Sequence, residues 1–289
     1  MAARVQCASG DVAPDRNGGR VKASRSIAAV AHGKEGSRKV MRSLPEETPV
    51  AVTVNGTTQA VMMCSPSDLE DFAVGFAFTE GFATPEQIER VEIVELEAGI
   101  EARLWVADAV AEALGARRRA MMGPVGCGLC GIDSLEEALR ALPVLPEGRA
   151  MDATTAASGP DLLRDHQPLH DLTQAVHAAG FLVPGQGIVL ACEDVGRHNA
   201  LDKLVGAMQR ERLDPMAGAI VLTSRVSVEM VQKTVLLGCP ILIAVSAPTA
   251  HALRMAEAAN LTIAAFARDG RLETFTHSQR IDRSQTDAA

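Results

Sequence analysis

Four short apolar runs, each of strand length, fill the second half of this chain and alternate with helical patterns. The runs cover residues 188–192, 219–223, 240–246 and 261–267. The intervening helical patterns begin near Asn199, which we expect to cap the first helix, and near Val226 and Pro248. Strands that are apolar throughout are typical of parallel sheets covered by helices on both faces. The alternation therefore predicts an α/β fold with a largely parallel sheet over residues 132–281.

The first half of the chain has the pattern of a smaller α+β unit. Residues 48–54 and 60–64 are predicted strands, and Asn55-Gly56 between them favours a hairpin because both residues accept positive φ. A helix is predicted to open at residues 65–68. Residues 91–96 and 102–106 are predicted to form further short strands.

Composition divides the chain into five segments. Residues 1–45 are rich in Gly, Ser, Ala and Arg without a sustained period, so we expect a disordered leader. The small α+β subdomain follows at residues 46–116, and residues 117–131 have no regular period, so we expect a mobile loop. The αβα domain covers residues 132–281, with a Pro/Gly/Ala-rich connection at 141–160, and residues 282–289 form a tail.

The charge of the chain is unevenly distributed. Residues 1–45 carry a net charge of +6, whereas the remainder carries −14. The acidic remainder of the chain does not favour nucleic acid as a partner. The absence of tyrosine also leaves few aromatic rings for base stacking. No apolar run approaches about 18 residues and no secretory signal is evident, so we expect no membrane span and no export. Six scattered cysteines form no disulfide framework, and the cytoplasm is the expected location.

Polar residues gather where the four predicted strands end. In open α/β sheets, ligands bind outside the carboxyl ends of the strands, so these residues are the candidates for a binding site. They are Glu193, Asp194, Arg197 and His198 after the first strand, Ser224 and Arg225 after the second, Ser246 after the third, and Arg268, Asp269, Gly270 and Arg271 after the fourth. Three of the four ends supply arginine, which suits phosphate contacts. A ligand that carries phosphate or pyrophosphate is the resulting hypothesis.

Cys127 and Cys130 form the only close cysteine pair of the chain, and glycines flank it. A dithiol oxidoreductase would usually place such a pair at a helix start beside an aromatic residue, and no aromatic residue lies nearby. A structural zinc site would need two more ligands, and only His166 and His170 have a suitable spacing. The zinc deaminase signature is incomplete, because the proline is displaced and no H-x-E precedes it.

The remaining interpretation of the pair is a thiol that carries sulfur. Flanking glycines would let the loop reach from one active site to another, and the arginines at residues 117–119 would favour thiolate over thiol. We therefore prefer sulfur transfer, with a redox or zinc-binding protein as an alternative, although no zinc is expected. The other cysteines are expected in the tail or the core. They are Cys7, Cys64, Cys192 and Cys239.

Several motifs together resemble the formate dehydrogenase accessory sulfurtransferase family, FdhD. The resemblance covers most of the chain, from about residue 47 to residue 281. It is carried by Val54-Asn55-Gly56, Gly75-Phe76, Glu80-Gly81-Phe82, Cys127-Gly128-Leu129-Cys130-Gly131, the block EDVGRHNALDK from Glu193 to Lys203, Thr223-Ser224-Arg225, Val245-Ser246-Ala247-Pro248-Thr249 and Phe266-Ala267-Arg268. The long block is highly specific, whereas a CxxC alone would not be.

The resemblance implies a cytidine-deaminase-like, three-layer αβα domain without zinc chemistry. It implies that a cysteine desulfurase loads sulfur onto the catalytic pair Cys127 and Cys130, with Cys127 as the persulfide intermediate. The sulfur would pass to the bis(molybdopterin guanine dinucleotide) molybdenum cofactor for formate dehydrogenase. The matching cofactor-binding segment is Phe266, Ala267, Arg268, Asp269, Gly270 and Arg271. The family also suggests a homodimer. A chaperone that binds the cofactor without sulfur transfer is the main alternative.

Overall fold

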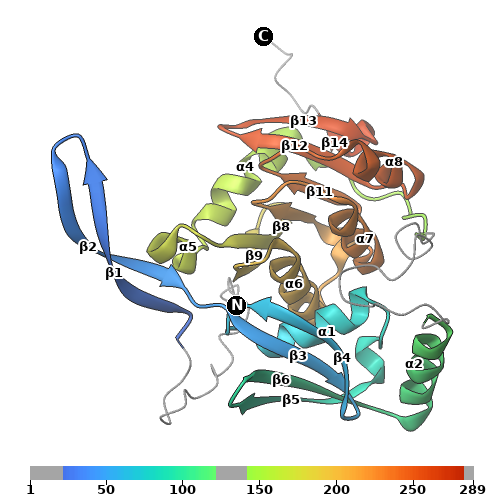
Figure 1. Ribbon diagram of the computed structural model, residues 1–289. Helices are drawn as coiled ribbons and strands as arrows, with labels where there is room; N and C mark the ends of the chain where they lie inside the picture. Colours follow the sequence, from blue (N-terminus) through green and yellow to red (C-terminus); the bar gives the residue numbers. More distant parts are fainter. Residues whose placement is uncertain (1–21, 122–141, 283–289) are drawn as a thin grey trace.

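The computed structural model describes residues 22–121 and 142–282, which form a projecting arm and two packed domains (Figure 1). Each domain is built around its own sheet, and the arm is a separate two-stranded sheet. Predictions for residues 1–21, 122–141 and 283–289 lie outside the described residues. These include the start of the leader, most of the CxxC loop and most of the tail.

The arm is a β hairpin of β1 (Ser24–Gly33) and β2 (Gly36–Pro45), which pair antiparallel along their full lengths. The prediction of a disordered leader up to residue 45 is therefore wrong for residues 24–45. The sequence conceals this hairpin because almost all of its residues are exposed on both faces. The alternation of apolar and polar residues that marks a half-buried strand is consequently weak here.

The small domain is an α+β unit, as predicted. Its sheet has the order β4-β3-β6-β5, with β3 and β6 parallel at the centre and antiparallel pairs at both sides. The strands are β3 (Thr48–Val54), β4 (Thr57–Cys64), β5 (Ile88–Leu96) and β6 (Gly99–Val106). Helix α1 (Leu69–Thr79) packs Phe72 and Phe76 onto one face of this sheet. The short helix η1 (Pro85–Gln87) and helix α2 (Asp108–Met121) complete the unit, so the prediction of a mobile loop from residue 117 is wrong for residues 117–121.

The large domain is built on a six-stranded sheet with the order β13-β12-β11-β10-β8-β9. Its strands are β8 (His177–Val183), β9 (Gly187–Asp194), β10 (Ala219–Leu222), β11 (Ile241–Ala244), β12 (Thr262–Arg268) and β13 (Arg271–Thr276). Only β10-β11 and β11-β12 pair parallel, and the other three pairs are antiparallel. The prediction of a largely parallel sheet is wrong, because β8 and β13 run against the four predicted strands.

Helices cover both faces of the large sheet, as the apolar strands predicted. Helices α6 (Arg197–Glu211), α7 (Val228–Leu237) and α8 (Ala250–Ala258) pack into one core with one face of the sheet. Helix α4 (Ala153–Arg164) packs into a second core on the opposite face. Helix α5 (Pro168–Thr173) and the short helices η2 (Pro215–Ala217) and η3 (Ser278–Arg280) lie outside these layers. Strands β7 (Met151–Asp152) and β14 (Ile281–Asp282) form a small parallel pair.

Two local predictions for the large domain need correction. The connection predicted for residues 141–160 contains the start of α4, capped by the Asp152 side chain, which accepts a hydrogen bond from Thr155 N at 2.8 Å. The N-cap of α6 is Gly196 and not Asn199, whose side chain lies buried inside the first turn. The cytidine-deaminase likeness stays a prediction. No helix in the described residues is long and apolar enough to cross a membrane.

The two domains meet where α1 lies against α6, with glycines at the crossing. A Cβ atom placed on Gly75 of α1 would lie 1.8 Å from the Asp202 carbonyl oxygen, and one on Gly206 of α6 would lie 1.9 Å from the Asp71 carbonyl oxygen. The helix backbones are therefore in direct contact. Beside them, the buried Lys233 ammonium group binds both Asp202 carboxylate oxygens, at 2.8 and 3.0 Å, and the Thr79 hydroxyl at 2.9 Å.

Candidate functional site

The carboxyl ends of β9, β10, β11 and β12 lie on one edge of the large sheet, which we call the strand-end edge. The ladder explains this geometry, because β8 runs antiparallel to both β9 and β10 and so leaves these two strands pointing the same way. Strands β10, β11 and β12 are mutually parallel. Four strand spacings separate β9 from β12, which amounts to about 19 Å. The edge can therefore hold an extended ligand, but it does not gather all candidate residues at one point.

Asp194, at the end of β9, is fully used by the protein's own donors. One carboxylate oxygen accepts from Ser65 N at 2.9 Å and contacts the Lys203 ammonium at 2.7 Å. The other accepts from Gly196 N at 2.8 Å and from the Asn199 amide at 2.9 Å. The side chains of Asp194 and Lys203 are 0% exposed. Asp194 thus fastens the small domain to the strand-end edge and has no free oxygen to offer a ligand.

Glu193 also has a role within the fold. Its carboxylate oxygens accept hydrogen bonds from Leu169 N and His170 N, both at 2.8 Å, in the first turn of α5. Burial raises the pKa of Glu193, and the two backbone N–H groups oppose that shift. Both predicted acids of β9 therefore shape the edge, and neither faces outward as a ligand-binding group.

Arg197 and His198, in the first turn of α6, contain two buried nitrogen atoms without hydrogen-bond partners among the described residues. These atoms are the Arg197 Nε and the His198 Nε2. Buried polar groups are almost always paired in native proteins, so two unpaired nitrogen atoms at the strand-end edge make it a candidate binding site. Helix α6 has no side-chain hydrogen bond at its N-cap, and helix N-termini favour anions.

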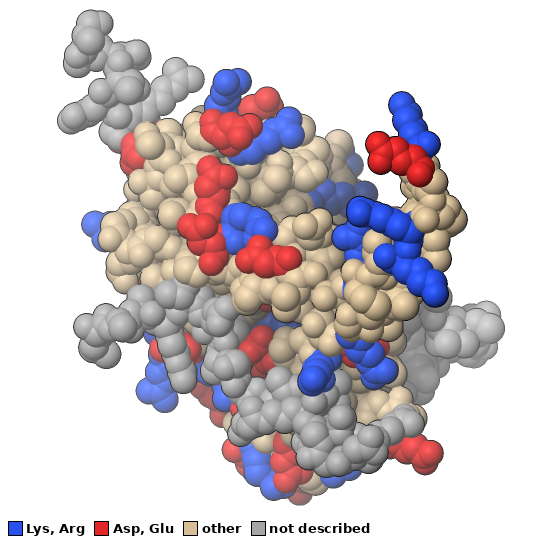
Figure 2. Space-filling model, turned by 90° about the vertical axis from the view of Figure 1, so that its left-hand side faces the viewer, with Lys and Arg blue, Asp and Glu red and all other residues tan. Residues whose placement is uncertain are grey.

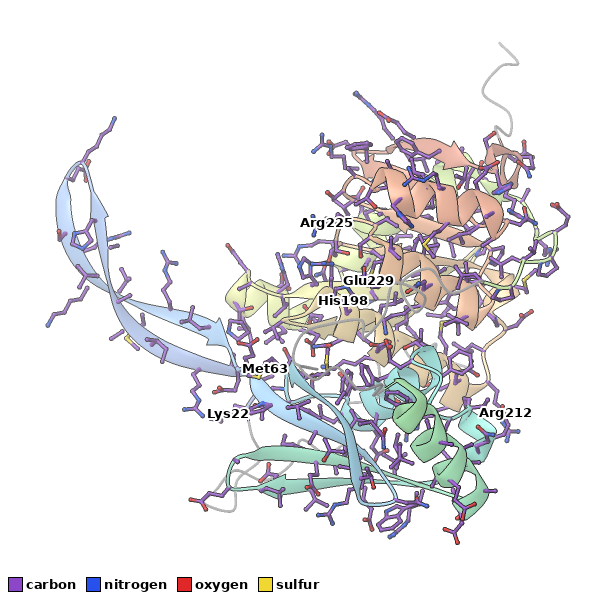
Figure 3. All side chains as sticks on the ribbon, turned by 45° about the vertical axis from the view of Figure 1, so that its right-hand side comes forward. Lys22, Met63, His198, Arg212, Arg225 and Glu229 are labelled. Carbon is purple, nitrogen blue, oxygen red and sulfur yellow. The ribbon has the colours of Figure 1, made fainter. Side chains whose placement is uncertain are left out.

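Glu229, in the first turn of α7, lies opposite His198 (Figure 3). The His198 Nε2 atom is 3.8 Å from a Glu229 carboxylate oxygen, which accepts a hydrogen bond from the Ser227 hydroxyl at 2.7 Å. Burial and the neighbouring Arg197 lower the pKa of His198, while Glu229 opposes them. Burial alone would raise the pKa of Glu229, but the Ser227 hydroxyl and the nearby cations lower it.

His177 is a further residue of the strand-end edge. It begins β8 directly opposite Asp194. Burial and Arg197 lower the pKa of His177. We did not expect His177, Ser227 or Glu229 from the sequence. Glu229 could have been found as the acid in the first turn of the helix after the second apolar run, whereas His177 depends on a strand that the sequence pattern did not show.

The other candidates on β10 and β11 differ in exposure. Ser224 is buried and donates a hydrogen bond to the Arg225 carbonyl oxygen at 3.0 Å. Arg225 and Ser246 are exposed to solvent. Arg225 is thus available to a ligand, while the Ser224 hydroxyl serves its own loop.

Phe266 to Arg271 form a distorted turn between β12 and β13 at the far end of the edge. Phe266 has φ 51° and Asp269 has φ 51°, and the pairing register shifts between Ala265 and Arg268. An aromatic residue with positive φ is strained by about 1–3 kcal/mol, and such strain clusters at functional sites. Ala267 is buried, whereas the Phe266 ring is 38% exposed and lies 6.1 Å from the Phe275 ring. Arg268 and Arg271 face each other across the turn and are exposed with Asp269 and Gly270.

Cys127 and Cys130 lie outside the described residues, and the structure describes the chain on both sides of them. On one side, α2 belongs to the small domain. On the other, Leu145 N donates to the Ala259 carbonyl oxygen at 2.9 Å, and the Asn260 amide donates to the Leu145 carbonyl oxygen at 2.8 Å. These contacts lie just before β12, at the edge opposite the strand ends. The segment that carries the two cysteines therefore joins the two domains.

The free cysteines of the described residues, Cys64 and Cys239, are unsuited to thiolate chemistry, and Cys192 is disulfide-bonded. All three are buried, in line with their prediction as core residues. Burial raises the pKa of Cys239 to about 12 and raises that of Cys64 further. In the described part of the chain, no three His, Cys, Asp or Glu side chains are grouped as metal ligands.

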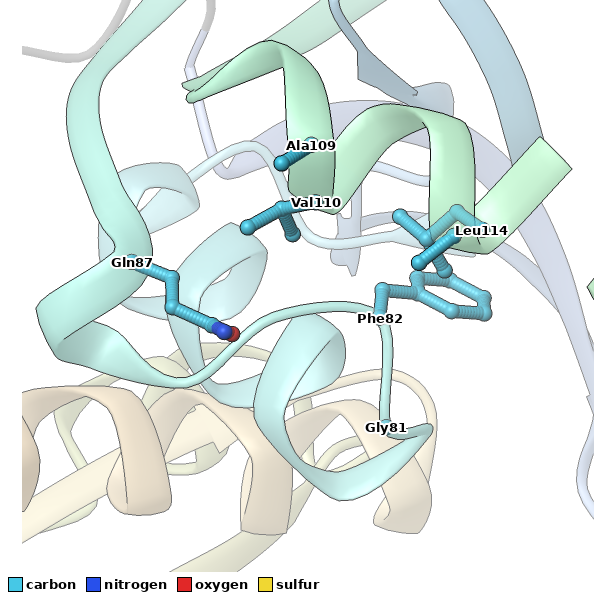
Figure 4. Close-up of a pocket in the computed structure, with 7 residues that line it drawn as sticks. Gly81, Phe82, Gln87, Ala109, Val110 and Leu114 are labelled. Atoms are coloured by element: carbon cyan, nitrogen blue, oxygen red, sulfur yellow. The ribbon is translucent and has the colours of Figure 1, made fainter.

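A separate apolar pocket of about 380 Å³ lies on the small domain (Figure 4). It is lined by Gly81, Phe82, Gln87, Ala109, Val110, Ala113 and Leu114. No charged side chain lines it, so it does not suit a phosphate group. It lies between the end of α1 and helix α2, away from the strand-end edge.

Comparison with known proteins identifies the family of this chain. Residues 45–282 match the model of the FdhD/NarQ family. The chain belongs to the FdhD/NarQ family. It is 49% identical over 242 residues to the sulfur carrier protein FdhD of Agrobacterium fabrum, covering 83% of this chain and 89% of the relative. It is 52% identical over 270 residues to the sulfur carrier protein FdhD of Brucella abortus, covering 91% and 98%.

A solved structure supports the fold of this family member. The crystal structure of a putative formate dehydrogenase accessory protein from Desulfotalea psychrophila superposes with a TM-score of 0.73 at 25% sequence identity. The match covers 90% of this chain and all of that one. The family resemblance expected from the motifs is confirmed, and so is a mixed α/β fold.

Proposed function

We propose that this FdhD/NarQ-family chain carries sulfur from a cysteine desulfurase to the bis(molybdopterin guanine dinucleotide) molybdenum cofactor required by formate dehydrogenase. The observation that carries this proposal is the family match, which spans residues 45–282 and so includes both Cys127 and Cys130. Two relatives that match over most of their lengths bear the name sulfur carrier protein. The cytoplasm is the proposed location, and a homodimer is the proposed assembly.

Cys127 is the proposed sulfur acceptor, with Cys130 as its partner. The Cys127 thiolate would attack the terminal sulfur of the desulfurase persulfide, and the desulfurase cysteine would leave as a thiolate. One S–S bond breaks and one forms, so the step needs no oxidant. Cys64 and Cys239 are poor competitors because burial keeps their thiols protonated.

The strand-end edge is the proposed binding site for the cofactor, which is the substrate of the transfer. The unpaired Arg197 Nε at one end and the exposed Arg268 and Arg271 at the other suit phosphate groups. A span of about 19 Å suits a ligand with two nucleotide arms better than a single phosphate. The exposed Phe266 ring offers a surface on which guanine could stack.

Mass spectrometry tests the thiol assignment. After incubation with cysteine and a desulfurase, the wild-type protein should gain the mass of one sulfur, and dithiothreitol should remove it. The Cys127→Ala variant should neither gain sulfur nor activate formate dehydrogenase. Cys7→Ala, which removes a cysteine outside the family match, is the matched control and should behave like the wild type.

The same variants separate the alternatives. Full activation of formate dehydrogenase by the Cys127→Ala protein would favour a chaperone that binds the cofactor without sulfur transfer. One zinc per chain, lost when Cys127 and Cys130 are both replaced, would favour a structural metal site. Either result would contradict the sulfur-carrier proposal.

A nucleotide titration tests the site at the strand-end edge. Guanosine diphosphate carries the base and phosphates of the cofactor arm, and Arg268→Ala or Arg271→Ala should each weaken its binding by about 1–3 kcal/mol. Arg254→Ala, an exposed arginine on α8, is the control. Sulfur loading of Cys127 should persist in Arg268→Ala. Unchanged nucleotide affinity in both site variants would place the cofactor elsewhere.

A further inference from the structure

His198 places an unpaired nitrogen atom next to the arginine of the proposed phosphate site. It follows Arg197 in the first turn of α6. The His198 Nε2 atom is buried and has no hydrogen-bond partner among the described residues. A carboxylate oxygen of Glu229, on α7, faces it at 3.8 Å, which is too long for a hydrogen bond (Figure 3). The two side chains are thus close enough to form an ion pair after a small approach, but they do not form a hydrogen bond in the ligand-free protein.

The charges around His198 act in opposite directions. Burial is the main cause that lowers the pKa of His198, and Arg197 lowers it further. From α7, Lys233 also lowers this pKa, whereas Glu229 raises it. Burial and Arg197 likewise lower the pKa of His177, at the start of β8. Because the ordinary pKa of histidine is about 6.5, His198 is neutral at pH 7.

The other charged groups that pack against this part of α6 have partners within the fold. The Lys233 ammonium binds the carboxylates of Asp202 and Glu80, at 2.8 and 2.9 Å. Asp194, at the end of β9, accepts from backbone and side-chain donors on both oxygens. Arg197, in contrast, has an Nε atom without a hydrogen-bond partner in the described part of the chain. Its charge is therefore the one near His198 that a bound anion can offset.

An anion on Arg197 changes the balance at His198. The anion would offset the charge that opposes protonation, and Glu229 would then favour the imidazolium form. We propose that His198 takes up a proton from solvent when a pyrophosphate-bearing ligand binds Arg197, and that Glu229 holds the protonated ring through a charge-assisted hydrogen bond. The proton adds one positive charge to the site and gives the Nε2 atom a partner. This inference rests on the proposed cofactor site and concerns the regulation of that site by pH.

Local groups, rather than the charge of the whole surface, decide how an anion binds here. The chain has a formal net charge of −8, and Figure 2 shows acidic and basic side chains interspersed on one face of the molecule. Such a surface does not attract a pyrophosphate group at long range. One added charge on His198, directly beside Arg197, is therefore a large change for the site.

Protons and the ligand then strengthen each other's binding. A ligand that raises the proton affinity of His198 is itself bound more tightly by the protonated protein, by the same factor. The ligand affinity should be highest below the pKa of His198 in the free protein. It should fall as the pH rises from that value to the higher pKa of the complex, and it should be constant above, where neither form holds the proton.

Isothermal titration calorimetry with guanosine diphosphate mannose measures the proton directly. This probe carries guanosine and a pyrophosphate diester, whereas the terminal phosphate of guanosine diphosphate titrates at about pH 6 and would take up protons itself. At pH 6.5, the binding enthalpy of the wild type should depend on the ionisation enthalpy of the buffer, with a slope of up to about one proton per site. The dissociation constant should rise about fivefold or more between pH 6 and pH 8.

Three variants assign the proton to one residue. His198→Gln and Glu229→Gln should each lose most of the proton uptake, because neither variant can form the ion pair. His32→Gln, which replaces an exposed histidine on the arm, is the matched control and should take up as many protons as the wild type. Circular dichroism confirms that each variant is folded. In the wild type, nuclear magnetic resonance of labelled histidines should show the pKa of His198 rising when the probe binds.

The outcomes separate this inference from the proposed function. Binding of the probe without proton uptake, or uptake that persists in His198→Gln, would overturn the role of His198 while the cofactor site stands. A wild type that does not bind the probe at any pH between 5.5 and 8 would contradict the cofactor site itself.

Discussion

At the scale of single residues, Asp68 of the small domain carries a buried carboxylate that is incompletely hydrogen-bonded. It precedes α1 with φ 51° and caps no backbone N–H through its side chain. One of its oxygen atoms is buried without a hydrogen-bond partner. Burial raises the pKa of Asp68 to about 6, although Lys203 opposes the shift. The folded protein therefore holds a charge at neutral pH that it accommodates poorly.

We predict that Asp68→Asn stabilises the protein at pH 8 and has little effect at pH 3.5. An acid whose pKa is raised on folding destabilises the native state above that pKa, and the effect vanishes once both states are protonated. A rise to about 6 corresponds to at most about 3 kcal/mol at pH 8. Asparagine also tolerates positive φ. Denaturant unfolding at the two pH values measures the difference.

Asp161→Asn, at an exposed position of α4, is the control for Asp68→Asn. It should change stability little at either pH. Equal stabilisation by Asp68→Asn at pH 3.5 and pH 8 would mean that backbone conformation, and not the buried charge, is responsible.

The strand-end candidates show how far single residues can be assigned from sequence. Their common location follows from the apolar runs, since the four predicted strands do end at one edge. The hydrogen-bond partners of these residues, in contrast, cannot be predicted from the sequence pattern. Asp194 binds Ser65, which is 129 residues earlier in the chain, and this contact exists only because the small domain folds back onto β9. Residue type alone could not separate Asp194, which fastens the fold, from Arg197, which has an unpaired nitrogen.

At the scale of elements, the crossing of α1 and α6 depends on two glycines. We predict that Gly206→Ala destabilises the protein by more than about 3 kcal/mol. The added methyl group would overlap the Asp71 carbonyl oxygen, and backbone atoms cannot turn aside as a flexible side chain can. Gly33→Ala is the control, because a Cβ there would meet nothing within 4 Å. Thermal unfolding of both variants compares them, and similar melting temperatures would contradict a tight crossing.

The sequence pattern misses the elements that are either buried on both faces or exposed on both faces. Strand β8 has the sequence HAAGFLV and is buried along most of its length, so it lacks the alternation of a half-buried strand. Its small residues also lower its strand propensity. The sequence pattern misses the hairpin of β1 and β2 for the opposite reason, because nearly every residue of it is exposed. The four apolar runs, in contrast, are rich in Ile, Val and Leu, and their pattern identifies them.

At the scale of the whole molecule, the two domains have separate apolar cores but share a buried ion pair. The Asp202 carboxylate of α6 and the Lys233 ammonium of α7 lie beside Thr79 of α1. Burial alone would lower the pKa of Lys233, but the carboxylates of Asp202 and Glu80 raise it. The charge of Lys233 and the charge of Asp202 thus depend on each other and on the contact between the domains.

We predict that the protein unfolds in a single calorimetric transition and that Lys233→Met lowers its stability by about 3–5 kcal/mol. The substitution leaves the Asp202 carboxylate buried without its counter-ion. The double variant Asp202→Leu/Lys233→Met should recover much of the loss, because no buried charge then remains. Two separate transitions in the wild type would show that the domains unfold independently, contrary to this expectation.

The glycine crossing also limits how this protein can move. Shear motion between domains requires packed helices that slide past each other. Where α1 meets α6, carbonyl oxygens press against glycine Cα atoms, and Asp194 and Lys203 fasten the adjoining loops. The two domains are therefore expected to behave as one rigid body. Opening by domain rotation is therefore not available to the strand-end edge, and any ligand of this edge must reach it from the surface.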